Sequence, residues 1–196
     1  MALENCTNLQ FLALDLFDNQ ITNQGASTLG NSLANCIKLT NLSLNMNCNQ
    51  ISAQGVLDLS SAIQKCSNLS SLSLQLHGNT LGAYGVQALG SNLSKSASLQ
   101  NLTLNIQGNQ IHDEGAVSLG SALLMCNNLK ILNLNLSSNQ ISFQGAYSLI
   151  RALRNCNRLS IFNLIIRYNQ INYEEKYQLI NQAYKYKRLV ENTINL

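Results

Sequence analysis

Apolar residues recur with a fixed period along almost the whole chain. In the first period they stand at Leu9, Leu12, Leu14, Leu16 and Ile21. Adding 30 to each number returns an apolar residue in each of the next five periods, and Asn19 returns in the same way as asparagine. The sequence is therefore an array of six 30-residue periods with a partial unit at each end, which predicts a single solenoid domain over residues 1–196.

Each period predicts one strand and one helix. The alternation in Leu12-x-Leu14-x-Leu16 is typical of a strand with one buried face. Further along, apolar residues spaced three, four and three apart indicate one stripe of a helix: Ala26, Leu29, Leu33 and Cys36. Good N-cap residues precede the helix in four periods: Thr22, Ser52, Ser142 and Asn172.

A strand and a helix that repeat in this order predict a curved stack. The connection from each helix to the next strand makes a right-handed crossover to a parallel neighbour. Strands stack about 4.8 Å apart, whereas helices are about 10 Å wide. We therefore expect an α/β arc, shaped like an open horseshoe, with parallel strands on the concave face and helices on the convex face.

The repeated residues resemble a known family. The pattern L-x-x-L-x-L-x-L-x-x-N-x-I-x-x-x-G resembles the leucine-rich repeat of the ribonuclease-inhibitor type, with an extra Leu-x pair in every strand. Similar 30-residue arrays rich in Asn and Gln occur in large proteins of single-celled eukaryotes, sometimes beside a kinase domain. The resemblance implies a solenoid that binds other proteins.

Composition excludes several other classes. Leu and Asn together fill a third of the chain, with 36 Leu and 29 Asn. There is no Pro, and no apolar run approaches the roughly 20 residues of a membrane span. The net charge of +3 is too small to indicate a nucleic-acid partner. The first residues have no basic stretch followed by an apolar one, so we expect no signal peptide and a cytoplasmic location.

Three columns of the repeat have structural interpretations. The Asn19 column is expected to satisfy the backbone of neighbouring turns, because an amide both donates and accepts. The Gly25 column lets the backbone approach the sheet closely. Five of the six cysteines share one column and are expected to be buried, reduced thiols, while Cys48 lies outside it and should be the most exposed. No His or Cys stands at metal-ligand spacing, which argues against zinc.

The concave face is the expected partner-binding surface, because solenoids usually bind there. Alternation assigns to it a middle field of neutral amides, and the sharper interpretation places binding anchors at its two ends. The candidate residues are Phe11, Asp15, Phe17, Asn45, Asn47, Gln75, His77, Asn105, Gln107, Asn135, Ile161, Ile165 and Arg167. The simpler interpretation is that Asn45, Gln75, Asn105 and Asn135 only hydrogen-bond to one another along the sheet.

The last quarter of the chain is basic. Residues 1–150 carry four Lys or Arg and six Asp or Glu, whereas residues 151–196 carry eight and three. A solvated end cap explains Lys176, Lys185, Lys187 and Arg188. Arg151, Arg154 and Arg158 recur at helical spacing, and the alternative is a convex basic patch for an acidic partner.

These patterns predict a non-enzymatic scaffold for protein–protein interaction. No catalytic set, metal cluster or cofactor loop stands out, so no cofactor is expected. Alternatives are a regulatory or sensor arm of a larger protein, either kinase-linked, GTPase-regulating or of the nucleotide-binding receptor type, and a structural part of a large assembly. Because the first strand would have an open edge, we expect a longer chain or an assembly to cover residues 1–20.

Overall fold

The computed structural model describes residues 2–184 and 191–196. The strands are β1 (Phe11–Asp15), β2 (Asn41–Asn45), β3 (Ser71–Gln75), β4 (Asn101–Asn105), β5 (Ile131–Asn135), β6 (Ile161–Ile165) and β7 (Glu191–Asn195). The helices are α1 (Asn23–Leu33), α2 (Ala53–Ile63), α3 (Gly82–Leu93), α4 (His112–Leu124), α5 (Phe143–Leu153) and α6 (Tyr173–Tyr184), preceded by a short 3-10 helix (Ala2–Asn5). Lys185, Lys187, Arg188 and Leu189 lie outside the described residues.

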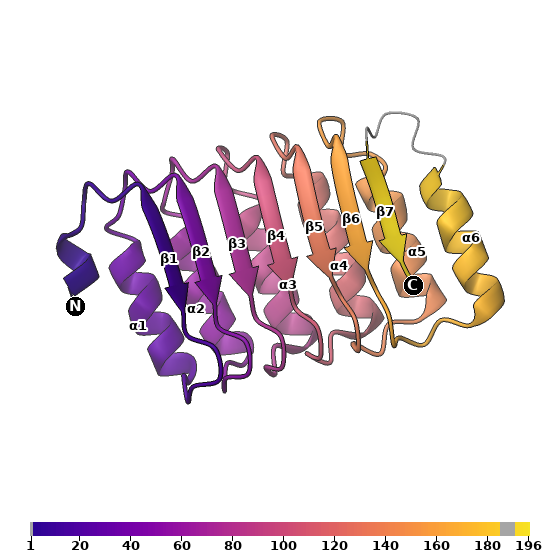
Figure 1. The fold of residues 1–196 in the computed structure, drawn as a ribbon, viewed down its shortest axis with the longest axis horizontal. Helices are drawn as coiled ribbons and strands as arrows, with labels where there is room; N and C mark the ends of the chain where they lie inside the picture. The colour runs from indigo at the N-terminus through magenta and orange to yellow at the C-terminus, as the bar shows by residue number, and fades with distance from the viewer. Residues whose placement is uncertain (1, 185–190) are drawn as a thin grey trace.

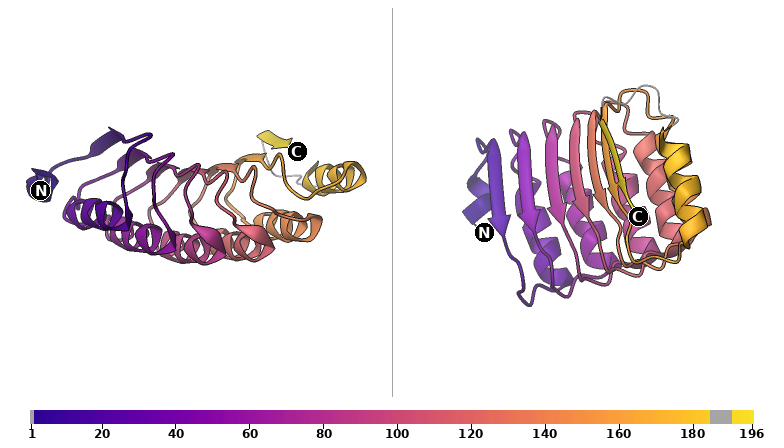
Figure 2. Two further views of the ribbon diagram at one scale, coloured as in Figure 1. Left: turned by 90° about the horizontal axis from the view of Figure 1, so that it is seen from below. Right: turned by 45° about the vertical axis from the view of Figure 1, so that its right-hand side comes forward.

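The strands form one parallel sheet in chain order, and the helices cover one of its faces (Figure 1). The register is constant, so that Leu14 lies opposite Leu44 and Leu44 opposite Leu74. Seen from below, the helices follow an arc and the strands lie on its inner side (Figure 2). The expected open α/β arc with a concave sheet is therefore confirmed.

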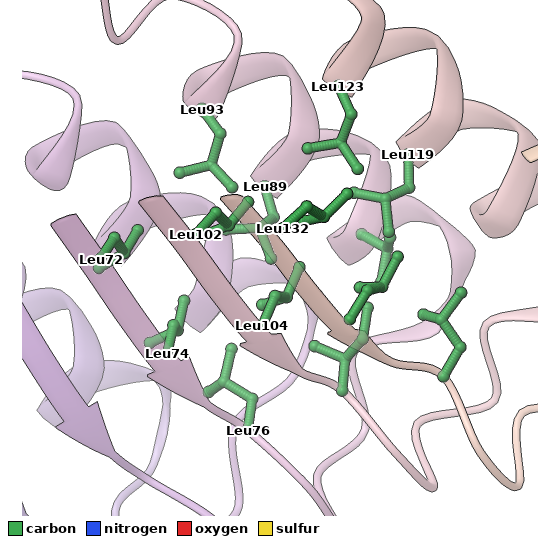
Figure 3. Close-up of a cluster of buried hydrophobic side chains, with 14 of the residues drawn as sticks. Leu72, Leu74, Leu76, Leu89, Leu93, Leu102, Leu104, Leu119, Leu123 and Leu132 are labelled. Atoms are coloured by element: carbon green, nitrogen blue, oxygen red, sulfur yellow. The ribbon is translucent and has the colours of Figure 1, made fainter. Parts of the chain in front are cut away.

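The core lies between the sheet and the helices. Leu72, Leu102 and Leu132 point from neighbouring strands toward Leu89 and Leu119 of α3 and α4 (Figure 3). All five are buried. Fully burying a leucine side chain contributes about 1.5–3 kcal/mol, so each unit gains most of its stability from the same few columns. The predicted strand and helix stripes are thus the two walls of one continuous core.

Side chains of the asparagine column connect neighbouring units. The Asn139 amide nitrogen donates to carbonyl oxygens of its own turn, Leu136 at 3.0 Å and Ser137 at 3.1 Å, and to Ile106 of the preceding unit at 2.9 Å. Its Oδ1 accepts the Asn109 backbone N–H at 2.7 Å. Asn19, in the first unit, is exposed, and among the described residues its side chain donates only to the Phe17 carbonyl of its own turn. The expected structural ladder is confirmed.

The glycine column has a different neighbour from the one expected. A Cβ on Gly85 would lie 2.9 Å from Cα of Ala53, and one on Gly55 would lie 3.0 Å from Cα of Asn23. Both contacts are with the preceding helix and not with the sheet. The glycine therefore allows successive helices to approach closely at their N-terminal ends.

The cysteine column lies just beyond the helices. Cys36, Cys66 and Cys126 are buried and follow the last helical residue of their units. The Cys66 thiol donates to the Leu33 carbonyl of the preceding unit at 3.4 Å. Burial raises the pKa of Cys66 to about 11. Three of the five column members are thus buried, as expected, but Cys6 and Cys156 are half-buried. Cys48 is half-buried too, so the structure does not set it apart as the most exposed thiol, contrary to expectation.

The turn after each strand has a left-handed residue that the sequence analysis did not identify. Six equivalent positions have φ between +50° and +66°: Asp18, Cys48, Gly78, Gly108, Ser138 and Tyr168. Only two of them are glycine, so the pattern is hidden in the sequence. The N–H groups of the first five continue the ladder between units, as in Cys48 to the His77 carbonyl at 2.7 Å.

The four expected N-cap residues all precede a helix, but they differ in what they do. Asn172 and Glu175 form a reciprocal capping box, with bonds of 3.0 and 2.8 Å. Ser142 accepts the Gln144 N–H at 3.1 Å. Thr22 and Ser52 make no side-chain cap bond. Capping therefore defines the start of the last two helices more strongly than the start of the first two.

Candidate functional site

The concave face presents one set of side chains per unit. Among the expected site residues, Phe11, Asp15, Asn45, Gln75, Asn105, Asn135, Ile161 and Ile165 lie in strands. The others, Phe17, Asn47, His77, Gln107 and Arg167, lie in the turns that follow the strands. Their leucine neighbours in β2–β6 point into the core. The alternation that assigned these residues to the concave face is therefore present in the structure.

In four strands the side chain of the last residue accepts a hydrogen bond from the backbone of the turn that follows. Asn105 Oδ1 accepts the Gln107 N–H at 3.2 Å, and Asp15, Asn45 and Asn135 accept from the equivalent backbone position. Among the described residues, no hydrogen bond joins Gln75 to Asn45 or Asn105. The expected continuous ladder of Asn45, Gln75, Asn105 and Asn135 is therefore wrong, because the three asparagine oxygens accept from their own turns and the Gln75 amide nitrogen donates to Ser73 of its own strand.

A shorter amide chain runs through the middle of the strands. Asn163 donates to Asn133 Oδ1 at 2.7 Å, and Asn133 donates to Thr103 Oγ1 at 3.3 Å. These three equivalent positions belong to β6, β5 and β4. They fix the orientation of the side chains at the floor of the concave face.

A hollow of about 240 Å³ opens on this floor. Its polar lining is Gln75, Thr103, Asn105, Asn133, Asn135 and Asn163, and Ile165 forms an apolar wall. None of these side chains is charged. Among the described residues, the Gln75 amide oxygen and the Asn105 amide nitrogen have no hydrogen-bond partner, so the hollow offers both an acceptor and a donor.

Larger side chains lie at the two ends of the concave face. Phe11 and Phe17 are 66% and 51% exposed at the β1 end. At the other end Ile165 is exposed, and Arg167 donates from Nε to Asn195 Oδ1 at 2.6 Å. The structure therefore places the two expected anchor groups at opposite ends of the sheet, with the neutral hollow nearer the Ile165 end.

His77 has a structural environment. Its backbone N–H donates to Asn47 Oδ1 at 2.7 Å, and its Nδ1 lies 3.2 Å from the Gln107 carbonyl oxygen. Within residues 2–184 and 191–196, no group of three His, Cys, Asp or Glu side chains is arranged to hold a metal ion. The contacts of His77 thus orient its ring on the turn between units.

The three arginines of the expected basic patch do not share one helix. Arg151 lies in the last turn of α5 and Arg154 directly follows that helix, whereas Arg158 lies in the turn before β6. All three are exposed. Arg154 contacts Gln182 of α6 at 3.4 Å, and Arg158 contacts Asn128 of the preceding unit at 2.7 Å. The helical spacing in the sequence therefore misplaces Arg158.

The structure brings Lys130 close to Arg158, which the sequence analysis did not foresee. The two side chains line one hollow at the edge of the sheet. Lys130 directly precedes β5, at a position where every other unit has a neutral residue: Gln10, Thr40, Ser70, Gln100 and Ser160. A comparison of the charges at this equivalent position in all units would have identified Lys130 from the sequence.

Comparison with known proteins agrees with this architecture. The "Leucine Rich repeat" family model matches residues 5–30, 38–60 and 98–120. No curated protein sequence matches the chain significantly. Two solved structures have a similar fold, each at 14% identity. Leiomodin-1 actin-binding site 2 has a TM-score of 0.56, with 82% of this chain and 87% of that chain covered. The tropomodulin C-terminal domain of Caenorhabditis elegans has a TM-score of 0.57, with 84% and 92% covered.

The fold and its repeated columns define an open α/β solenoid. The chain contains leucine-rich repeats, which the family model matches over residues 5–30, 38–60 and 98–120, and the two solved structures share its fold. Among the residues that the structure describes, no helix has the length and apolar character needed to cross a membrane.

Proposed function

We propose that the chain is a non-enzymatic scaffold that binds a protein partner on its concave face. The observation that supports this most directly is the hollow across β3–β6, where the Gln75 amide oxygen and the Asn105 amide nitrogen have no partner among the described residues. Neutral amides pair well with other neutral polar groups, such as the main-chain amides of a peptide segment. Phe11, Phe17, Ile165 and Arg167 would add anchoring contacts at the two ends, since aromatic and Arg side chains often dominate binding energy.

This proposal has a matched test. Thr103 lies within the hollow on β4, whereas Gln87 is exposed on the outer side of α3. Thr103→Arg should abolish capture of the partner from extracts of the source cells, because it places a bulky charge among neutral groups. Gln87→Arg adds the same charge elsewhere and should leave capture intact. Equal loss with both variants would count against a concave site.

The same proposal predicts binding that resists salt. At about 1 M salt the Debye length is about 3 Å, so contacts between exposed charges are largely screened. A partner held by neutral amides should remain bound there. Release of the partner between low and high salt would instead point to the charged surfaces of the chain.

A structural role in a cytoskeletal assembly is the second candidate. One of the solved structures with this fold is an actin-binding site of leiomodin-1. Sedimentation of this chain with filamentous actin tests the candidate directly, and a chain that stays in the supernatant would remove it.

An arm of a larger regulatory protein, and an assembly that covers residues 1–20, are compatible with the same concave site. The six free thiols support a cytoplasmic location.

A further inference from the structure

Cationic side chains gather at one rim of the arc, where the helices end and the strands begin (upper edge in Figure 1). The residues at this rim are Lys38, Lys65, Lys95, Lys130, Arg151, Arg154 and Arg158. Between residues 115 and 173 the sequence has five Lys or Arg and no Asp or Glu. The part of the rim formed by residues 115–173 therefore carries positive charge and no carboxylate of its own; at the next strand the rim has Glu191, the first residue of β7, opposite Ile161 of β6.

Lys130 and Arg158 occupy a recess in this rim. A hollow of about 340 Å³ is lined by both side chains together with Gln100, Asn128 and other neutral residues. A second hollow of about 340 Å³ is also lined by Asn128 and Arg158. No Asp or Glu lines either hollow. Two cations thus face a concave space without a counter-charge.

Both cations are held in place by the ladder between units. The Lys130 backbone N–H donates to the Gln100 carbonyl at 2.7 Å, and the Lys130 carbonyl accepts the Ser160 N–H at 2.8 Å. The Lys130 ammonium donates to Gln100 Oε1 at 2.8 Å. Arg158 donates to Asn128 Oδ1, and Asn128 in turn donates to the Ala97 carbonyl, both at 2.7 Å. The recess is therefore preorganised by its neutral neighbours.

Most donors of these two side chains remain available. A guanidinium has five N–H donors and an ammonium has three. In the described part of the chain, Arg158 and Lys130 each use one of theirs in a side-chain hydrogen bond. The remaining donors require an oxygen acceptor from water or from a ligand.

The helix dipole does not account for this pair of charges. Cations near a helix C-terminus compensate its partial negative charge, and this effect fades beyond the last turn. That explains Lys65, Lys95 and Arg151, which lie at or next to the ends of helices. Lys130 and Arg158 stand close to the strands that follow, well past the last helical turn.

We infer that the Lys130–Arg158 recess binds the phosphoryl group of a phosphorylated peptide segment in a protein partner. A phosphoserine or phosphothreonine carries about −1.5 to −2 charges at pH 7, which matches the two cations. The planar fork of Arg158 suits two phosphate oxygens, while Lys130 contributes a compact charge. A recess of this size favours a projecting side chain over a flat membrane surface. This site is distinct from the neutral concave face.

The inference is tested with a dye-labelled phosphoserine peptide, followed by fluorescence anisotropy at low salt. The same peptide with serine or glutamate in place of phosphoserine shows whether the phosphoryl group is recognised. The wild-type chain should bind the phosphopeptide at least about tenfold more tightly than the serine peptide. The Lys130→Gln/Arg158→Gln variant should lose that difference.

Lys65→Gln/Lys95→Gln is the matched control, because it removes two exposed cations from the same rim. It should change phosphopeptide affinity by less than about twofold. Equal loss with both double variants would show a diffuse field along the rim and overturn the site. Equal binding of the serine or glutamate peptide would overturn the phosphoryl assignment. Binding of anionic vesicles or of a second copy of the chain, lost only in the Lys130→Gln/Arg158→Gln variant, would overturn the assignment to a phosphopeptide.

Discussion

The side chains that repeat most strictly are those whose polar atoms bridge neighbouring units. Asn109 and Asn139 are fully buried, and each satisfies backbone groups in two consecutive turns. An alanine could not replace these bonds, because a methyl group neither donates nor accepts. The column therefore contributes to the coupling of units as much as the leucines do.

Replacing Asn139 by alanine should be costly. Three carbonyl oxygens and the Asn109 N–H would lose their partner in a buried site, and each unsatisfied group costs about 1–3 kcal/mol, partly relieved by relaxation. We expect Asn139→Ala to lower the free energy of unfolding by about 2–4 kcal/mol, measured by urea denaturation. Asn19→Ala, at the exposed first position of the same column, should change it by less than about 0.5 kcal/mol. Similar effects at both positions would refute the bridging role.

The buried thiols predict a loss of stability in alkaline solution. Burial raises the pKa of Cys66 to about 11 and that of Cys126 to about 12, from an ordinary value of 9.0. Their stabilising contribution is complete below pH 9, where both folded and unfolded thiols are protonated. As pH rises above 9 the unfolded chain loses these protons first, so the free energy of unfolding should fall between pH 9 and 12.

The Cys66→Ser/Cys126→Ser variant separates this effect from the titration of Tyr and Lys. A serine hydroxyl stays protonated through this range, so the variant should lose less stability between pH 9 and 12 than the wild-type chain. Urea denaturation at a series of pH values gives the comparison. Parallel curves for the two proteins would rule out the thiols as the cause.

At the scale of the helix, a small residue near the N-terminal end sets the distance to the preceding helix. Gly85 and Gly55 contact the backbone of the preceding helix, whereas a Cβ on Gly25 would meet only the Ile21 side chain at 3.0 Å. In the sixth unit this position is Glu175, and α6 packs less closely on α5 than the other helices pack on their neighbours. The residue at this position therefore controls how tightly two units join.

Alanine at two members of this column should have opposite effects. Gly85→Ala would place its Cβ 2.9 Å from Cα of Ala53, so we expect a loss of about 1–3 kcal/mol in the free energy of unfolding. Gly25→Ala would meet only the end of the Ile21 side chain and should gain from the higher helix propensity of alanine, by up to about 1 kcal/mol. Thermal or urea denaturation distinguishes the two. Destabilisation by both would mean that the backbone conformation, rather than helix spacing, requires the glycine.

The regular elements were predictable because their signals repeat. The positions of Leu12, Leu14 and Leu16 are apolar in all six complete periods, so a chance alternation in one unit could not mislead the prediction. The left-handed turn residue was not predictable, because the N–H groups of Asp18, Cys48 and Ser138 join the ladder in that conformation regardless of their side chains. Backbone pairing between units therefore overrides local preference there.

Of the two candidate sites, one was predictable from the sequence and the other was not. The concave face followed from alternation, since a side chain's face depends only on its place in the strand. The Lys130–Arg158 recess did not, because these residues come from different units and meet through the 30-residue register. Arg158 was also assigned to a helix that ends earlier, at Leu153. Predicting contacts between units therefore requires comparing equivalent positions of neighbouring units, in addition to knowing the 30-residue period.

At the scale of the whole molecule, the arc is held together by neighbours alone. Each helix packs on the next helix and each strand pairs with the next strand, and no element in the described residues contacts one two units away. Stability is then close to a sum of unit and interface terms. A solenoid of this kind should tolerate the loss of a whole unit but not the loss of its register.

Two deletions within the helices separate length from register. Removing residues 57–86 joins Val56 to Gln87 and keeps every later residue in its column. Removing residues 57–85 joins Val56 to Val86 and turns the rest of that helix by about 100°. Leu89 and Leu93 would then leave the core face of the joined helix. The first variant should fold with wild-type helix content per residue and a lower melting temperature, because one unit and one interface are lost.

The second variant should show reduced helix content by circular dichroism and association on a sizing column, since its joined helix exposes leucines to solvent. Its chain is one residue longer than that of the first variant, so chain length cannot explain the difference. If both deletions melted alike, the columns would not be coupled through a fixed register. The 30-residue period would then describe the sequence without controlling how the units pack.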